Sequence, residues 1–69
     1  MTIIGIDPGI ARVGWGAIRI QDTGFRIQDV GCFETSKKDP LDQRLLSISS
    51  FLKELFAKYK PDCVAVEQL

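Results

Sequence analysis

Two acidic residues, Asp7 and Glu67, are the strongest candidates for chemistry in this 69-residue sequence. Each directly follows a run of apolar residues, where a charged side chain adds little to a core. Carboxylate pairs bind hard cations such as Mg²⁺ and Mn²⁺, and repel each other when no cation lies between them. The chain has no histidine and only two cysteines. This excludes Ser-His-Asp and Cys-His catalytic groups, a histidine general base and a zinc site of thiolates and imidazoles within these residues.

Three strands are expected in the first half of the chain, over Thr2–Ile6, Val13–Ile20 and Phe25–Phe33. The first is apolar at nearly every position, which is typical of a central strand covered on both faces. The short polar connections between the three favour an antiparallel meander. Alternation in the third strand predicts that Phe25, Ile27 and Phe33 share one face.

The next segment predicts one amphipathic helix from about Leu41 to Tyr59. Asp39 is suited to cap its first turn, and Pro40 fits the first helical position. Pro61 prevents the helix from continuing. Six apolar side chains with 4-3-4-3-4 spacing are expected to form a stripe buried in the core: Leu41, Leu45, Ile48, Leu52, Leu55 and Tyr59.

A fourth strand, Cys63–Val66, is again apolar on both faces. A strand reached through a helical crossover pairs parallel to an earlier one, so the predicted α/β sheet has the order 3-2-1-4. Asp7 and Glu67 then emerge at the same edge, with Cβ atoms about 5 Å apart. Cys32 lies three strands from Cys63, about 14 Å away, which is too far for a disulfide. Both cysteines are interpreted as small core residues.

Asp7 also has a simpler interpretation, because Asp7-Pro8-Gly9 is good turn chemistry by itself. The matching position of Glu67 favours metal binding. Four of the six glycines are expected near this edge, namely Gly5, Gly9, Gly14 and Gly16. Glycine lets a phosphate approach the backbone, or only makes room for a neighbouring side chain. Arg12 is either a phosphate contact or a solvated side chain, and Trp15 is expected to pack.

The composition and length limit which classes of protein the chain can belong to. Nine basic and nine acidic residues balance, so charge gives no indication of a nucleic-acid partner and does not exclude one. No apolar run approaches the roughly 18 residues that span a membrane, and no secretory leader is expected, which favours the cytoplasm. A chain of this length is one small domain at most, or part of one.

Several motifs resemble the N-terminal half of the RuvC-type Holliday-junction resolvases, the crossover junction endodeoxyribonucleases. They are Ile4-Gly5-Ile6-Asp7-Pro8-Gly9, Gly14-Trp15-Gly16 and, after the stop at Pro61-Asp62, Ala65-Val66-Glu67-Gln68. The resemblance covers essentially all 69 residues. It implies a ribonuclease-H-like α/β fold, with residues 1–69 as the N-terminal portion of a single nuclease domain whose C-terminal half is absent.

The resemblance also implies a bacterial, Mg²⁺-dependent endonuclease that resolves four-way DNA junctions in recombination and repair. Such proteins act as homodimers and work beside a branch-migration complex. Asp7 and Glu67 would be two of four catalytic acids around two Mg²⁺ ions, for which Mn²⁺ is an alternative. The other two acids lie near the C-terminus of the family, so the 69-residue chain by itself is expected to be inactive.

Three other interpretations stay open. The sugar-kinase, actin and heat-shock ATPase group also opens with a strand and Asp-x-Gly, but usually carries small hydroxyl residues where Ile10-Ala11-Arg12 stand here. A YqgF-like nuclease of RNA processing has a similar opening and fits the Glu67-Gln68 strand end less well. The third interpretation is a non-catalytic fragment or binding module.

Overall fold

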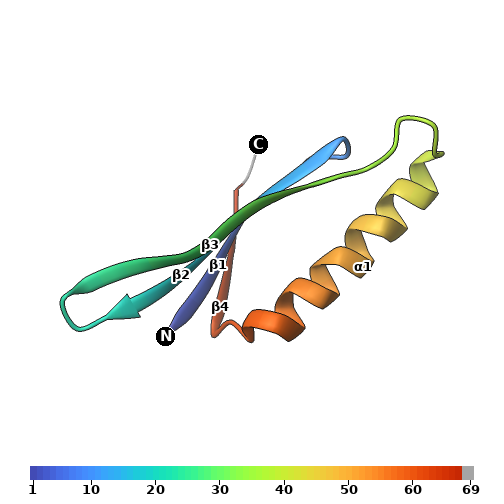
Figure 1. Ribbon diagram of the computed structural model, residues 1–69. Helices are drawn as coiled ribbons and strands as arrows, with labels where there is room; N and C mark the ends of the chain where they lie inside the picture. Colours follow the sequence, from blue (N-terminus) through green and yellow to red (C-terminus); the bar gives the residue numbers. More distant parts are fainter. Residues whose placement is uncertain (68–69) are drawn as a thin grey trace.

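The computed structural model describes residues 1–67, which form four strands and one helix (Figure 1). In chain order these are β1 (Thr2–Asp7), β2 (Arg12–Gln21), β3 (Gly24–Glu34), α1 (Leu41–Tyr59) and β4 (Cys63–Val66). The strands form one sheet in the order β3-β2-β1-β4, with β1 antiparallel to β2 and parallel to β4. The predicted fold class and strand order are confirmed. Gln68 of the last motif lies outside the described residues.

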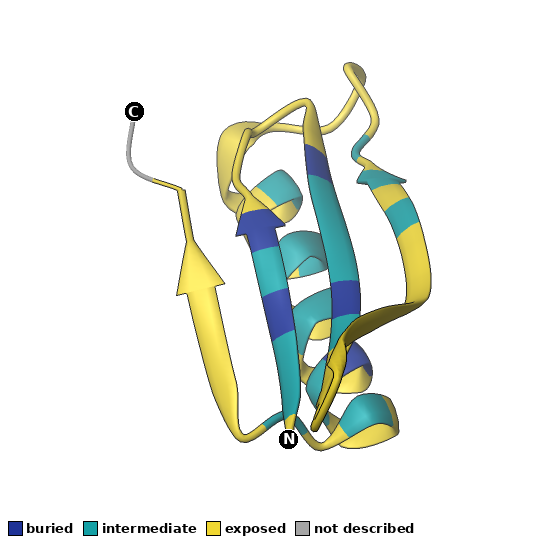
Figure 2. Ribbon diagram, turned by 90° about the vertical axis from the view of Figure 1, so that its left-hand side faces the viewer, coloured by how far each residue is buried: buried dark blue, intermediate teal, exposed yellow. Residues whose placement is uncertain are grey.

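The core lies between α1 and one face of the sheet. Because strand side chains alternate, Ile4 and Ile6 of β1 and Val13 and Ala17 of β2 point to the same side, where they meet Leu55 of α1. Figure 2 shows the sheet with α1 behind it and the buried segments confined to β1, β2 and the helix. Within residues 1–67, no helix is long and apolar enough to cross a membrane.

Trp15 packs between the sheet and α1, as predicted. Its ring centroid lies 6.4 Å from that of Phe51 and 5.8 Å from that of Tyr59. Gly31 is the cross-strand partner of Trp15, and a Cβ atom there would lie 2.7 Å from the indole. The indole therefore occupies the space that a side chain at position 31 would need.

One residue of β3, Gln28, has no partner in β2, because the register of the ladder shifts there. An extra residue reverses the alternation of side chains beyond it. The prediction that Phe25, Ile27 and Phe33 share one face is therefore wrong. Phe33 stacks on Phe51 of α1 with centroids 4.4 Å apart, whereas Phe25 and Ile27 lie on the other face and are 67% and 59% exposed.

The helix has the predicted bounds but a different start. Its N-cap is Pro40, in an extended conformation without a side-chain capping hydrogen bond, so the predicted cap by Asp39 is wrong. The N–H of Asp39 instead donates to the carbonyl of Ser36 in the preceding turn. At the other end, Lys60 is left-handed with φ of 46°, and its N–H donates to the Phe56 carbonyl.

The predicted apolar stripe of α1 is only partly covered. Leu55 is buried, but Leu41 and Leu45 in the first two turns are exposed. Three further stripe residues pack half-buried against the core: Ile48, Leu52 and Tyr59. Three residues of the stripe, Leu45, Ile48 and Leu52, line an apolar groove of about 490 Å³ between α1 and the loop after β1.

Both cysteines are free, as predicted, but both are exposed, so the expectation that they belong to the core is wrong. By the alternation of the strands, Cys32 of β3 and Cys63 of β4 lie on the face opposite α1. Nothing in residues 1–67 covers that face, and the four residues of β4 are exposed as well.

Candidate metal centre

The two predicted acids lie at the same edge of the sheet. Ile6 and Val66 are partners in the parallel ladder, and the N–H of Glu67 donates to the Ile6 carbonyl at 2.9 Å. Asp7 is the last residue of β1, and Glu67 directly follows β4. Because Ile6 faces α1, alternation places both carboxylates on the opposite face, and both residues are exposed.

Asp62 explains why this register forms. Its carboxylate accepts a hydrogen bond from the N–H of Thr2 at 2.8 Å, and its own N–H donates to the Thr2 carbonyl at 2.8 Å. These two bonds fix the start of β4 against the start of β1. Asp7 lies five positions after Thr2, and Glu67 lies five positions after Asp62. The clamp at one end of the strand pair therefore aligns the acids at the other end.

The acids border an open hollow of about 660 Å³, whose lining includes Gly5, Gly14 and Gly31. Gly14 is the cross-strand partner of Asp7, and a Cβ atom there would make ordinary contact with the Asp7 Cβ at 3.7 Å. A Cβ atom at Gly5 would meet nothing within 4 Å. The glycines thus leave bare backbone beside the carboxylates, which lets a ligand approach the sheet closely.

The loop that follows Asp7 depends on Gly9, which the sequence singled out, and on Thr35 and Arg44, which it did not. A Cβ atom at Gly9 would lie 2.7 Å from the Arg12 carbonyl oxygen, so the tight loop requires glycine there. Thr35, just after β3, donates from its hydroxyl to the Ile10 carbonyl at 2.6 Å and accepts from Nε of Arg44 at 2.8 Å. A lone threonine in a polar connection carries no sequence signal of such a role.

The described residues do not form a complete metal site. Within residues 1–67, no group of three or more acidic, cysteine or histidine side chains converges. Two exposed carboxylates on one face, beside bare backbone, still fit a hard cation, which accepts a few protein oxygens and keeps water or phosphate oxygens in its other positions. Arg12 is exposed, so its position is compatible with either of its two predicted roles.

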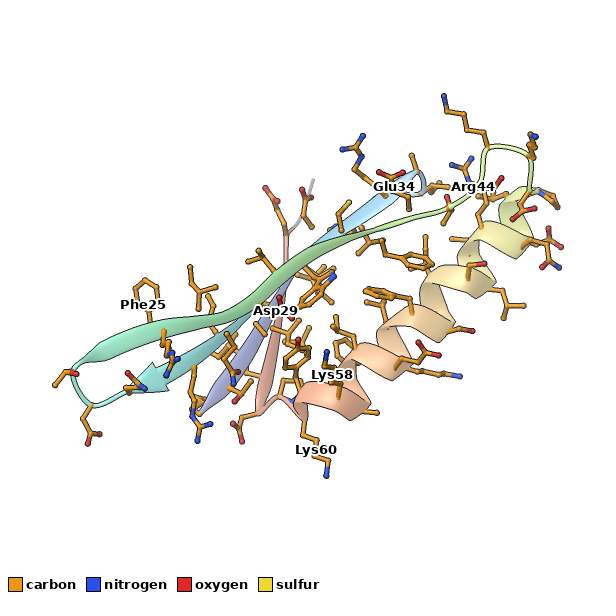
Figure 3. All side chains as sticks on the ribbon, viewed as in Figure 1. Phe25, Asp29, Glu34, Arg44, Lys58 and Lys60 are labelled. Atoms are coloured by element: carbon orange, nitrogen blue, oxygen red, sulfur yellow. The ribbon has the colours of Figure 1, made fainter. Side chains whose placement is uncertain are left out.

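A separate pair of titratable groups lies at the C-terminal end of α1. The Tyr59 hydroxyl donates to the Asp29 carboxylate at 2.6 Å. This bond, with a second from the Val30 N–H, lowers the pKa of Asp29, and the same carboxylate raises the pKa of Tyr59. Figure 3 shows Asp29 and Lys58 at this end of the helix, away from Glu34 and Arg44 at its start.

Comparison with known proteins identifies the family to which the chain belongs. Residues 3–69 match the family described as Crossover junction endodeoxyribonuclease RuvC. The chain belongs to the RuvC family. The resemblance carried by the Asp-Pro-Gly and Glu-Gln motifs is thereby confirmed.

Curated RuvC proteins match along the entire chain. Those of Alkaliphilus metalliredigens and Petrotoga mobilis are 45% and 46% identical to it over 69 residues, which is 42% of their own length. The solved structure of Thermus thermophilus RuvC in complex with a Holliday junction substrate superposes with a TM-score of 0.88 and 31% identity, over all of this chain and 45% of that one. The chain therefore spans less than half the length of these RuvC relatives.

Proposed function

We propose that residues 1–69 are the N-terminal portion of a single ribonuclease-H-like nuclease domain, and that Asp7 and Glu67 are two of its acidic metal ligands. The observation that carries this proposal is the register of β1 and β4, which aligns the two acids in a chain that matches RuvC over residues 3–69. The complete protein is a structure-specific DNA endonuclease. Its substrate is the four-way junction, an assignment supported by the Thermus thermophilus relative, which was solved in complex with a Holliday junction substrate.

Asp7 and Glu67 would hold Mg²⁺, with Mn²⁺ as an alternative, and the complete site would hold two ions. Such ions, when bound, lower the pKa of an attacking water and stabilise the leaving oxygen of a phosphodiester. The chain's own contribution is to present two carboxylates on one face and bare glycine backbone beside them. A phosphodiester could therefore approach without meeting side chains at Gly5 and Gly14.

The assembly follows from the symmetry of the substrate. Resolving a four-way junction requires two equivalent cuts, which a homodimer with twofold symmetry supplies. We place the complete protein in the bacterial cytoplasm, with a branch-migration complex as its further partner. These assignments rest on membership of the RuvC family.

The test uses a chimera in which residues 1–69 replace the matching segment of the Alkaliphilus metalliredigens RuvC. It should cleave a four-way junction with Mg²⁺. Asp7→Asn and Glu67→Gln should each lower the cleavage rate by more than about 1,000-fold, because metal ligation supplies several kcal/mol of transition-state stabilisation. Junction binding in a mobility shift should stay within about threefold, because affinity for DNA rests mainly on phosphate contacts.

Asp22→Asn is the matched control, since Asp22 is an exposed carboxylate in the β2–β3 turn, and its cleavage should be unchanged. If Asp7→Asn still cleaves, or loses binding as strongly as cleavage, the assigned role is wrong. The 69-residue chain itself should not cleave. It should bind Mg²⁺ more weakly than micromolar, because two protein ligands leave most of the coordination to water.

A further inference from the structure

The loop after Asp7, residues 8–11, is held from one side. The antiparallel pairing of β1 with β2 ends at Asp7 and Gly14. Beyond that point β2 is paired only with β3, through the pairs Val13–Phe33 and Arg12–Glu34. The loop that follows β1 therefore has no strand pairing with β1 or β4. Its position depends on contacts with the end of β3.

Thr35 supplies those contacts. Its backbone N–H donates to the Ala11 carbonyl at 3.0 Å and its hydroxyl donates to the Ile10 carbonyl at 2.6 Å. One residue therefore satisfies the last two carbonyls of the loop. Thr35 is half-buried, its hydroxyl bond to Ile10 is exposed, and its bond with Arg44 is partly buried.

Arg44, in the first turn of α1, sets the direction of the Thr35 hydroxyl. Its Nε–H donates to the hydroxyl oxygen at 2.8 Å. A threonine hydroxyl has one hydrogen and rotates to suit its partners. With a guanidinium donor on the oxygen, the hydroxyl hydrogen is directed to the Ile10 carbonyl. Figure 3 shows Arg44 at the start of α1, next to the end of β3 where Glu34 lies.

We infer that Thr35 and Arg44 are positioning residues for the candidate metal centre. They connect the start of α1 to the loop 8–11 and so fix the backbone that leaves Asp7. The part of this inference that concerns binding of the cation and the phosphodiester rests on the proposed function. The hold on the loop itself does not depend on it. Without the connection, the loop keeps only the backbone bond to Ala11. The backbone after Asp7 is then no longer held in one position, and neither is the Asp7 carboxylate.

The test uses the chimera in which residues 1–69 replace the matching segment of the Alkaliphilus metalliredigens RuvC, and two measurements by nuclear magnetic resonance. Amide nitrogen relaxation of Gly9, Ile10 and Ala11 gives order parameters, which should fall from about 0.85 to below about 0.6 in Thr35→Val. The Mg²⁺ dissociation constant, from shifts of the Asp7 amide, should rise about tenfold, the lower end of the effect of removing a group that orients a metal ligand. Thr35→Ser keeps the hydroxyl and should restore both values.

Arg44→Met provides a second variant that keeps the length of the side chain and the Thr35 hydroxyl. It should loosen the loop less than Thr35→Val does. Tyr59→Phe is the matched control, because it removes a hydrogen bond of α1 to β3 at the far end of the helix and should leave the loop and Mg²⁺ binding unchanged. All variants are compared at temperatures where thermal melts show them fully folded.

Order parameters that stay near the native value in both Thr35→Val and Arg44→Met overturn the inference. So does equal loosening of the loop in Tyr59→Phe, which would show a general loss of rigidity. If the loop loosens while the Mg²⁺ dissociation constant is unchanged, the role at the metal centre is overturned. If Mg²⁺ moves no signal of Asp7 even in the chimera without these substitutions, the proposed function fails instead, and the order parameters still decide whether the two residues hold the loop.

Discussion

The two faces of the sheet differ in what covers them. On the face toward α1, Ile4 is fully buried, and its neighbours form a small core with Leu55. On the opposite face lie the two acids at one edge and a series of exposed apolar side chains toward the β2–β3 turn: Ile20, Phe25, Ile27 and Val30. Apolar side chains are therefore covered on one face of the sheet and exposed to solvent on the other.

The apolar pattern of a strand predicts which of its two faces other parts of the protein cover. In residues 1–67 only one of these faces is covered. Apolar residues on both faces of β1 and β4 indicate cover on both sides, and residues 1–67 place a single helix on one side. A contiguous exposed apolar face marks an interaction surface or an aggregation liability. The RuvC relatives are more than twice as long as this chain. We therefore expect either their additional residues or a second copy of the chain to cover this face.

The largest expected effect is a difference in the free energy of unfolding between substitutions on the two faces. Ile4→Ala should lower the free energy of unfolding by about 2–5 kcal/mol, because it removes buried methyl groups and leaves a cavity. The matched substitution Ile27→Ala, at a side chain that is 59% exposed on the other face, should cost far less. Small domains have a total stability of about 5–15 kcal/mol, so Ile4→Ala should remove a large share of the stability of the chain. Urea denaturation followed by circular dichroism measures both, and equal losses would mean that the faces are equivalent.

The next effect concerns association. The 69-residue chain should be marginally stable and should self-associate through the uncovered face or the exposed edge of β4. Replacing Phe25 and Val30 with serine should raise the dissociation constant by more than about tenfold, since each apolar side chain contributes about 1.5–3 kcal/mol on full burial. Leu46→Ser is the control, because Leu46 is exposed on α1 instead of the sheet.

Sedimentation velocity at several concentrations measures this association. A native chain that stays a monodisperse monomer, and melts cooperatively above about 60 °C, would show that the uncovered face needs no partner. If Leu46→Ser disrupts association as strongly as the sheet variants, the contact surface lies on the helix.

The fold was predictable because its signals are local. Pro61 and the lysines near it end one helix, and a helical crossover requires a parallel strand, so the sheet order and the shared edge of Asp7 and Glu67 follow. The helix cap was not predictable in the same way. Asp39 has the right residue type, but it lies in a turn with Ser36, one residue before the N-cap position that Pro40 occupies.

The details that shape the site were hidden because they depend on contacts between distant residues. The register shift at Gln28 needs the partner strand to be known, and it decides that Phe25 lies on the uncovered face. The clamp between Thr2 and Asp62 joins residues 60 positions apart. The burial expected for Cys32 failed for another reason, since it assumed a second layer that residues 1–67 do not contain.

The smallest effect lies on the covered face, at the hydrogen bond between Tyr59 and Asp29. Tyr59→Phe should lower the melting temperature by less than about 5 °C, because both groups are solvent-accessible. The bond lowers the pKa of Asp29 from 3.8, so its stabilisation is present above that value and is lost as pH falls through the lower folded pKa. It raises the pKa of Tyr59 from 10.0, so its stabilisation is present below that value and is lost as pH rises through the higher folded pKa.

The difference in melting temperature between the native chain and Tyr59→Phe should therefore be largest between about pH 5 and pH 9 and shrink toward both extremes. Thermal melts across this range measure it. Asp29→Asn keeps an acceptor for the Tyr59 hydroxyl without the charge, so its own difference from the native chain should disappear at acid pH, where Asp29 becomes protonated. A difference for Tyr59→Phe that is constant from about pH 3 to pH 11 would show that the contribution of the hydroxyl does not depend on the ionisation of Asp29 or Tyr59, because phenylalanine keeps the ring that packs on Trp15.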